Sequence, residues 1–225
     1  MITDILPTEY IPLTVEDFFG PAREVAKSVM KHAEVCRKRN APAAYLFLGP
    51  SGTGKTALAL WTIRTAYEIN SWNIHDCFGG DLTVDRVREI AVSMHLTSLY
   101  PGFRAFFFDE LDKCSQEARA RLLELVGDRK QPKGTIIVAT SNLTADEFDR
   151  LEKSEGAKGR LTSRFSLYDV VGPTAPEAAP LLAKWLPTDQ ADKAAIMAAT
   201  GIDGSLGRIN VRAVLRDIER MITEQ

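Results

Sequence analysis

Short apolar runs alternate along much of the chain with stretches in which apolar residues recur at helical spacing. Five of the runs have the length of a strand: residues 43–48, 74–78, 105–108, 135–140 and 165–171. Helical patterns precede or separate most of them, at residues 21–35, 55–69, 84–94 and 116–126. Strands that are apolar throughout are buried on both faces, and their alternation with helices is typical of parallel sheets. The pattern therefore predicts an α/β domain with a five-stranded parallel sheet flanked by helices.

The pattern changes at a cluster of turn-forming residues, Gly172-Pro173-Thr174-Ala175-Pro176. Beyond it no strand-like run is visible, and Ala- and Leu-rich helical patterns occupy residues 178–186, 190–200 and 211–222. We therefore predict two parts, an α/β base over residues 1–172 and a small all-helical lid over residues 173–225.

Composition and charge narrow the classes of partner. The net charge of −2 provides no overall basic field, so any contact with nucleic acid would need a local patch. The apolar runs are too short to cross a membrane, and no secretory signal is visible, so we expect a cytoplasmic protein without a membrane partner. The three cysteines, Cys36, Cys77 and Cys114, lack metal-ligand spacing and are expected to be reduced thiols, two of them in the core.

The first candidate site is a glycine-rich segment that follows the first predicted strand and opens a helix. It reads Gly49, Pro50, Ser51, Gly52, Thr53, Gly54, Lys55 and Thr56, which fits the P-loop pattern at every fixed position. In such a loop the backbone N–H groups converge on phosphates at the positive end of the helix. Lys55 is expected to reach the β- and γ-phosphates of ATP, and the Thr56 hydroxyl to bind Mg²⁺.

Two further strands end in polar residues that should meet at the same edge of the sheet. Asp109 and Glu110 follow the strand at residues 105–108; Asp109 is expected to hold Mg²⁺, and Glu110 to orient or deprotonate the attacking water. Asp112 is interpreted as a capping or solvated turn residue. The next strand delivers Thr140 and Asn142, whose amide could bind water or the γ-phosphate. The alternative for Asn142 is that it only caps the following turn.

These residues resemble the AAA+ ATPases, and within them the clamp-loader and replication-initiator branch. The lead-in at residues 10–20 is similar to the segment that packs against adenine in that family. Residues 49–56 match Walker A, residues 106–110 match Walker B, and Asn142 falls where sensor 1 belongs. The resemblance implies a P-loop fold, bound ATP and Mg²⁺, and ATP hydrolysis.

Two arginines acquire roles through the resemblance. Arg160-Leu161-Thr162-Ser163-Arg164-Phe165 resembles the box whose arginine acts on a neighbouring subunit, which makes Arg164 the arginine finger and Arg160 a second candidate. The stretch at residues 207–215 resembles the start of the sensor 2 helix, with Arg212 as the nucleotide-sensing residue and Arg208 and Arg216 as competitors. An intersubunit site implies a homo-oligomer, or a hetero-oligomer with other AAA+ subunits. The alternatives are a surface ion pair for Arg164 and a solvated arginine for Arg212.

The substrate is left open by the sequence. Residues 79–88 resemble a segment that tracks DNA phosphates in clamp-loader relatives, although Asp81 and Asp85 do not suit an anion. The leading interpretation is an ATPase that drives assembly or remodelling on DNA. One alternative is a ring that remodels a protein partner, with Tyr100 and Phe103 on a pore loop, unless these aromatics pack in the core or a turn. Another is an ATP-dependent recruitment scaffold.

Overall fold

A computed structural model describes residues 12–18, 20–96, 101–127, 130–154, 160–174, 176–178, 202–203 and 207–216. Its centre is a five-stranded parallel sheet with the strand order β2-β3-β4-β1-β5. All five predicted strands are confirmed: β1 (Ala43–Leu48), β2 (Ile74–Phe78), β3 (Arg104–Asp109), β4 (Thr135–Ser141) and β5 (Ser166–Asp169). Every residue of β1 and β4 is buried, which explains their uninterrupted apolar runs.

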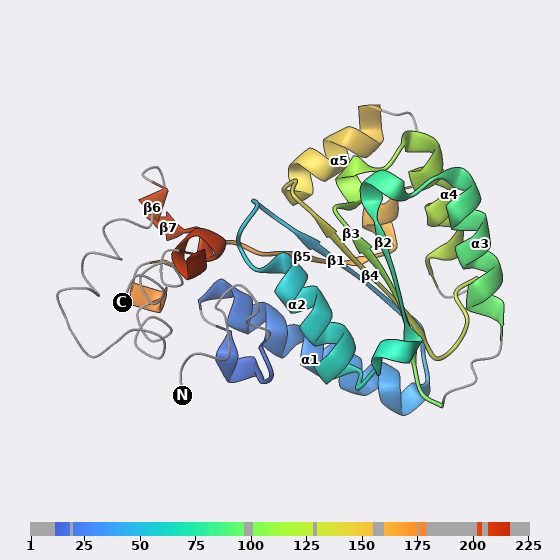
Figure 1. The fold of residues 1–225 in the computed structure, drawn as a ribbon, viewed down its shortest axis with the longest axis horizontal. Helices are drawn as coiled ribbons and strands as arrows, with labels where there is room; N and C mark the ends of the chain where they lie inside the picture. The colour runs from blue at the N-terminus through green and yellow to red at the C-terminus, as the bar shows by residue number, and fades with distance from the viewer. Residues whose placement is uncertain are drawn as a thin grey trace.

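Helices cover both faces of the sheet (Figure 1). One face carries α1 (Pro21–Arg39) and α2 (Lys55–Trp61), which continues as the π-helical turn η3 (Thr62–Ala66). The other face carries α3 (Val84–His95), α4 (Gln116–Leu125) and α5 (Ala145–Ser154). Short 3-10 turns connect these elements: η2 (Val15–Asp17), η4 (Ser71–Asn73), η5 (Gly79–Asp81), η6 (Leu111–Lys113) and η7 (Leu161–Ser163). Among the α-helices of the described residues, only α5 lies where the sequence pattern named no helix.

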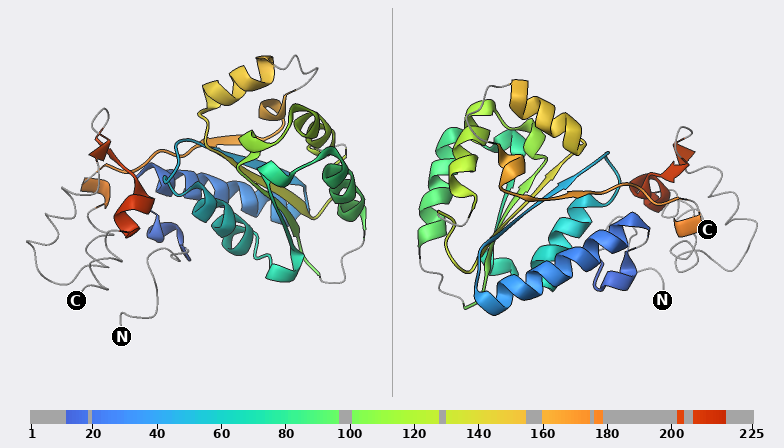
Figure 2. Two further views of the ribbon diagram at one scale, coloured as in Figure 1. Left: turned by 45° about the horizontal axis from the view of Figure 1, so that its top comes forward. Right: turned by 180° about the vertical axis from the view of Figure 1, so that it is seen from behind.

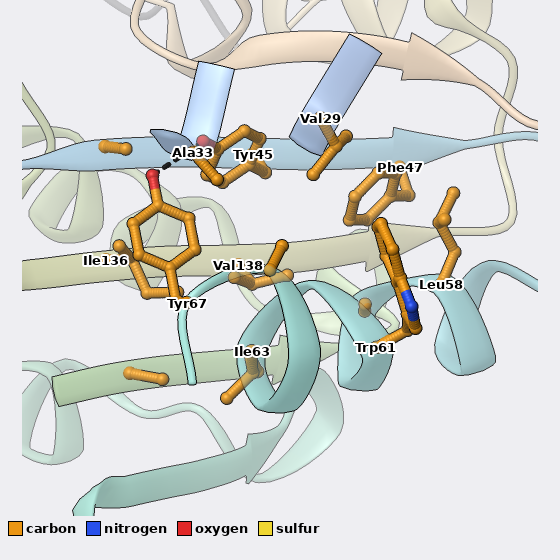
Figure 3. Packing of buried hydrophobic residues seen from close by; sticks show 14 of the residues in the cluster. Val29, Ala33, Tyr45, Phe47, Leu58, Trp61, Ile63, Tyr67, Ile136 and Val138 are labelled. Carbon is orange, nitrogen blue, oxygen red and sulfur yellow. Dashed lines mark hydrogen bonds between the residues drawn. The ribbon is translucent and has the colours of Figure 1, made fainter. Parts of the chain in front are cut away.

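The core on the α1–α2 side contains large aromatic side chains (Figure 3). The hydroxyl groups of Tyr45 and Tyr67 share a hydrogen bond of 2.7 Å inside it, and burial raises the pKa of both phenols. The ring of Phe103 packs edge-on against Tyr67 with centroids 5.2 Å apart, which places Phe103 on the core rather than on an exposed loop. Tyr100, the other aromatic of the predicted pore loop, lies outside the described residues.

The cysteines and the membrane expectation can be compared with the structure. Cys36 and Cys114 are buried and Cys77 is half-buried, so two of the three lie in the core, as predicted, and all three are thiols rather than members of a disulfide. No helix in the described ranges is long and apolar enough to span a bilayer.

The described part of the lid is not entirely helical, and in this respect the prediction is wrong. Two short strands, β6 (Ile202–Asp203) and β7 (Arg208–Ile209), pair in antiparallel fashion. Residues 211–216 are helical, as the pattern predicted, whereas most of the other expected lid helices fall outside the described residues. Strands of two residues are too short to produce a periodic pattern. The described lid segments lie beyond the end of β1 that leads into α2 (Figures 1 and 2).

Candidate active site

The glycine-rich loop leaves β1 and enters α2 through backbone conformations that only glycine adopts easily. Gly49, Gly52 and Gly54 have φ angles of 134°, 81° and 93°. A Cβ on Gly49 would lie 2.3 Å from the carbonyl oxygen of Val170, so the chain immediately after β5 passes too close for any side chain. The N–H of Gly49 donates to the carbonyl of Leu143 at 2.9 Å, which fixes the loop to the end of β4. The loop is therefore held from both neighbouring strands.

Lys55 is the cation of this loop. It is 6% exposed, and its Nζ donates to the carbonyl of Pro50 at 2.7 Å. Burial, and next the positive charge of Arg212, lower the pKa of Lys55 from 10.5 to about 8. A buried ammonium beside a second cation suits a polyanion such as a triphosphate, which would offset both charges.

Asp109 lies between two threonine hydroxyls. The Oγ1 of Thr56 donates to Asp109 Oδ1 at 3.2 Å, and the Thr140 hydroxyl donates to the same oxygen. Asp109 ends β3 and Thr140 lies on β4, its neighbour in the sheet, so strand pairing brings them together. Hydroxyl and carboxylate oxygens are ligands that Mg²⁺ accepts, so Thr56 and Asp109 fit the metal role predicted for them.

Glu110 has a constrained backbone and two partners from the β4 end. Its φ of 54° is left-handed, which is uncommon for a residue with a side chain. Its N–H donates to the Thr140 hydroxyl at 3.0 Å, and Nδ2 of Asn142 donates to its Oε1 at 3.0 Å. Asn142 therefore contacts the predicted catalytic carboxylate, rather than only capping the following turn. Thr140 contacts both acids, a double role that the sequence did not indicate.

Asp112 also differs from its interpretation as a capping or solvated residue. Its Oδ1 accepts the backbone N–H of Asn142 at 2.9 Å and thereby holds Asn142 beside Glu110. The two residues are 30 positions apart, so no local pattern could reveal this contact.

The start of the lid helix lies directly on the glycine-rich loop. Nδ2 of Asn210 donates to the carbonyl of Ser51, and the backbone N–H of Arg212 donates to that of Gly52, both at 3.3 Å. A Cβ on Gly52 would lie 2.1 Å from Oδ1 of Asn210. The resemblance at residues 207–215 includes Asn210 but implies no role for it, so this contact is evident from the structure alone.

The three lid arginines differ in position. Arg212 is exposed, and its charge acts on Lys55. Arg208 donates to the carbonyl of Gly172 at 2.8 Å, so its guanidinium binds the chain next to the predicted boundary. Arg216 is exposed, one turn further along the helix. The placement favours Arg212 as the residue that senses nucleotide, and that role stays a prediction.

Arg164 lies near the amino ends of the strands, whereas this site lies at their carboxyl ends. Ser166 pairs with Tyr45, near the beginning of β1, whereas the glycine-rich loop follows the end of β1. Four residues at about 3.3 Å per residue separate Tyr45 from Gly49 by about 13 Å, and Arg164 precedes Ser166 by two more residues. The exposed Arg164 guanidinium donates to the carbonyl of Val126 at 2.9 Å. The surface ion pair considered for Arg164 is made instead by Arg160, with Asp149 at 2.8 Å.

Only part of the predicted adenine-packing lead-in is described. Phe18 is 6% exposed and packs edge-on against Trp61 of α2, with ring centroids 5.3 Å apart. Arg23 ties the segment to α1 by donating to the carbonyls of Phe18 and Glu16. Tyr10, Ile11 and Phe19 lie outside the described residues, and the contact with adenine stays a prediction.

The predicted phosphate-tracking segment begins beside Glu110. A Cβ on Gly79 would lie 2.1 Å from the carbonyl oxygen of Glu110, so glycine is required there. Thr83 then caps α3 by accepting the N–H of Arg86. Both arginines of the segment form exposed ion pairs within the helix, Arg86 with Glu89 at 2.8 Å and Arg88 with Asp85 at 2.6 Å.

A strand, a glycine-rich loop with a buried lysine, and an acidic pair on the adjoining edge define a P-loop nucleoside triphosphatase. The family model described as ATPase family associated with various cellular activities (AAA) matches residues 45–166. That range is more than half of the chain, so the protein belongs to this family and is an ATPase. No curated protein matches the chain by sequence.

Solved structures of Thermotoga maritima RuvB have the same fold. One RuvB mutant aligns with a TM-score of 0.60 and 18% identity, over 95% of this chain and 74% of that one. Another aligns with a TM-score of 0.67 and 17% identity, over 95% of this chain and 65% of that one. At such low identity the similarity establishes the AAA+ fold alone.

Proposed function

We propose that this protein hydrolyses ATP at a site shared between two copies of the chain, and that the cycle drives assembly or remodelling on DNA. In that role it would resemble a clamp loader or a helicase or initiator loader. The observation that carries the proposal is the distance between its predicted catalytic groups. Glu110 and Asn142 lie at the carboxyl ends of the strands, while Arg164 lies near their amino ends.

Within one chain, the side chains fit the steps that precede the arginine. Lys55 would bind the β- and γ-phosphates, and Thr56 and Asp109 would hold Mg²⁺, which neutralises charge on the phosphates when bound. Glu110 would orient or deprotonate the attacking water. Asn142 would keep the Glu110 carboxylate in place, because its amide donates to one oxygen and leaves the other for water.

Phosphoryl transfer spreads negative charge over the γ-phosphate oxygens, and an inserted arginine accelerates it by about 10³- to 10⁵-fold. An arginine side chain is shorter than the roughly 13 Å of β1 that lies between the level of Ser166 and the glycine-rich loop. Arg164 would therefore act on the ATP of a neighbouring copy. Assembly would complete the site, and hydrolysis would release the neighbour.

The DNA part of the proposal is supported by the position of residues 79–88. Gly79 contacts the backbone of Glu110, so a ligand bound along this segment would adjoin the hydrolysis site. The ion pairs of Arg86 and Arg88 are exposed and contribute little stability, so phosphate groups could replace their carboxylates. The core position of Phe103 weighs against a pore loop that grips polypeptide. We further propose a cytoplasmic location, with which three cysteines outside any disulfide are compatible.

The experiment is a subunit-mixing assay. Lys55→Ala should abolish ATP binding, whereas Arg164→Ala should bind ATP and lose hydrolysis. A one-to-one mixture should recover about a quarter of wild-type turnover, the share of interfaces that pair an intact P-loop with an intact arginine in a random ring. Arg160→Ala tests the second candidate for the finger, and because Arg160 pairs with Asp149 within its own chain it should keep wild-type turnover. Failure of the mixture to recover, despite measured co-assembly, would contradict a site shared between copies.

A further inference from the structure

Glu152, near the end of α5, is a buried carboxylate outside the active site. It is 4% exposed, and glutamate is seldom buried without partners. Its Oε1 accepts the N–H of Leu161 at 2.6 Å. Its Oε2 accepts the hydroxyl of Thr162 at 2.9 Å and the N–H of Thr162 at 3.3 Å. All three bonds go to η7, the turn that connects Arg160 to Arg164.

The turn passes this constraint on to Arg164. The carbonyl of Leu161 accepts the N–H of Arg164 at 2.8 Å and that of Phe165 at 3.1 Å. Leu161 is 1% exposed, so it is also fixed by packing. Glu152 therefore fixes Leu161 through its N–H, and Leu161 in turn fixes the backbone of Arg164 through its carbonyl.

The other end of α5 adjoins the hydrolysis site. The helix begins at Ala145, shortly after Asn142, whose amide contacts Glu110. Leu143, between them, accepts the N–H of Gly49 from the glycine-rich loop. Ten helical residues extend for about 15 Å, so α5 connects the site at the carboxyl ends of the strands to the arginine turn, which lies toward their amino ends.

We propose that Glu152 is a positioning residue for Arg164, and that its carboxylate sets where the guanidinium stands at the ATP of the neighbouring copy. This inference rests on the proposed action of Arg164 between copies. Arg164 is exposed as a residue and its guanidinium donates to the carbonyl of Val126, so the backbone that Glu152 fixes, together with this bond, defines where the guanidinium lies. A misplacement of about 1 Å can cost about 10²-fold in rate, which makes such an anchor consequential.

The surface pair between Arg160 and Asp149 gives a matched contrast on the same helix. Asp149 also joins α5 to the arginine segment, but its partners Arg160 and Lys153 are exposed. Exposed pairs contribute little to positioning, because solvent screens them. Asp149→Asn should therefore leave turnover within about twofold of wild type.

The test uses Glu152→Gln in the full chain. The glutamine keeps the shape of the side chain but places an NH₂ group against the N–H of Thr162, where two donors cannot bond. We expect turnover to fall about 10²-fold with ATP affinity close to wild type, and the unfolding midpoint to fall by several degrees because a buried N–H loses its acceptor. Mixing with Lys55→Ala, which supplies an intact arginine, should recover activity as it does for Arg164→Ala. Mixing with Arg164→Ala should recover none.

Rescue by Lys55→Ala but not by Arg164→Ala separates positioning from a general loss of structure. A general loss of structure would also damage the variant's own P-loop site and prevent rescue by either partner. Wild-type turnover of Glu152→Gln would overturn the inference. So would absence of rescue by Lys55→Ala under conditions in which the Arg164→Ala mixture recovers. If the Arg164→Ala mixture itself does not recover, the shared site fails, and this inference fails with it.

A second variant keeps the test decisive if Glu152→Gln does not fold. Thr162→Val removes one of the three bonds and preserves the shape of the side chain. It should lower turnover about tenfold, since the other two bonds remain, with the same pattern of rescue. Wild-type turnover of a folded Thr162→Val protein would count against the role of Glu152.

Discussion

Raising the pH from about 7 to about 9 should weaken ATP binding, because Lys55 in the ligand-free protein loses its proton within that interval. Its pKa is lowered to about 8 by burial and by Arg212. Bound phosphates would favour the ammonium form and restore the pKa toward its ordinary value of 10.5. Binding above about pH 8 must therefore take up a proton.

The size of the effect follows from that shift. At about pH 9 roughly nine tenths of the free protein would carry a neutral Lys55, so ATP affinity should be about tenfold lower than at about pH 7, or about 1.4 kcal/mol. A lysine with an unshifted pKa would change affinity by only a few per cent, which is roughly zero on this scale.

Isothermal titration calorimetry in two buffers of different ionisation enthalpy measures both the affinity and the proton uptake. Glu110→Gln protein should be used, because it would bind ATP without hydrolysing it. Lys55→Arg in the same background is the control: an arginine keeps its charge, so any binding that remains should show little pH dependence beyond that of ATP itself. Equal affinities at both pH values, with no proton uptake by the Lys55 protein, would refute the reasoning.

The same pKa affects the ligand-free protein. Between about pH 8 and 10.5 the unfolded chain holds the Lys55 proton and the folded chain has released it. The unfolded state binds more protons in that window, so the contribution of Lys55 to folding stability should rise with pH there.

Three further perturbations test other parts of the site. In a steady-state ATPase assay, Thr140→Val should lower turnover about 10- to 100-fold with little change in ATP affinity, because Asp109 and Glu110 both lose a partner. The control is Thr62→Val, which removes a buried hydroxyl that bonds within its own helix. Gly52→Ala should weaken ATP binding at least about tenfold, through the clash with Asn210 and the left-handed backbone; Gly102→Ala has a similar φ but open space, and its ATP affinity should stay normal by calorimetry. In the Glu110→Gln background, fluorescence anisotropy of labelled DNA should show binding that needs ATP, is independent of DNA sequence and weakens steeply with salt. Arg86→Glu with Arg88→Glu should remove this binding, whereas Arg121→Glu should not. No ATP-dependent change in anisotropy, even at low salt, would contradict direct DNA binding.

The strands and the glycine-rich loop could be predicted because their signals are local. β1 is six consecutive buried residues, and the loop after it fits a pattern that fixes glycines, lysine and threonine. Asp109 and Glu110 were found because they directly follow a buried strand. Such features depend on neighbours in sequence and survive without knowledge of the strand order.

The contacts that complete the site depend on tertiary structure and could not be read from the chain. Thr140 meets Asp109 only because β3 pairs with β4 in one register. Asn210 meets the loop from 159 positions away. Helix α5 could not be predicted from the apolar pattern, because its buried positions include Glu152 and a buried charge breaks the apolar period by which helices are recognised.

The measurement that tests the shared site most directly is turnover per chain as wild-type protein is diluted through its assembly equilibrium, with the oligomeric state followed by analytical ultracentrifugation at saturating ATP. Turnover per chain should follow the fraction assembled and approach, in the dissociated protein, the low rate of Arg164→Ala, about 10³-fold or more below the assembled rate. Full turnover per chain in a protein shown to be monomeric would contradict the account.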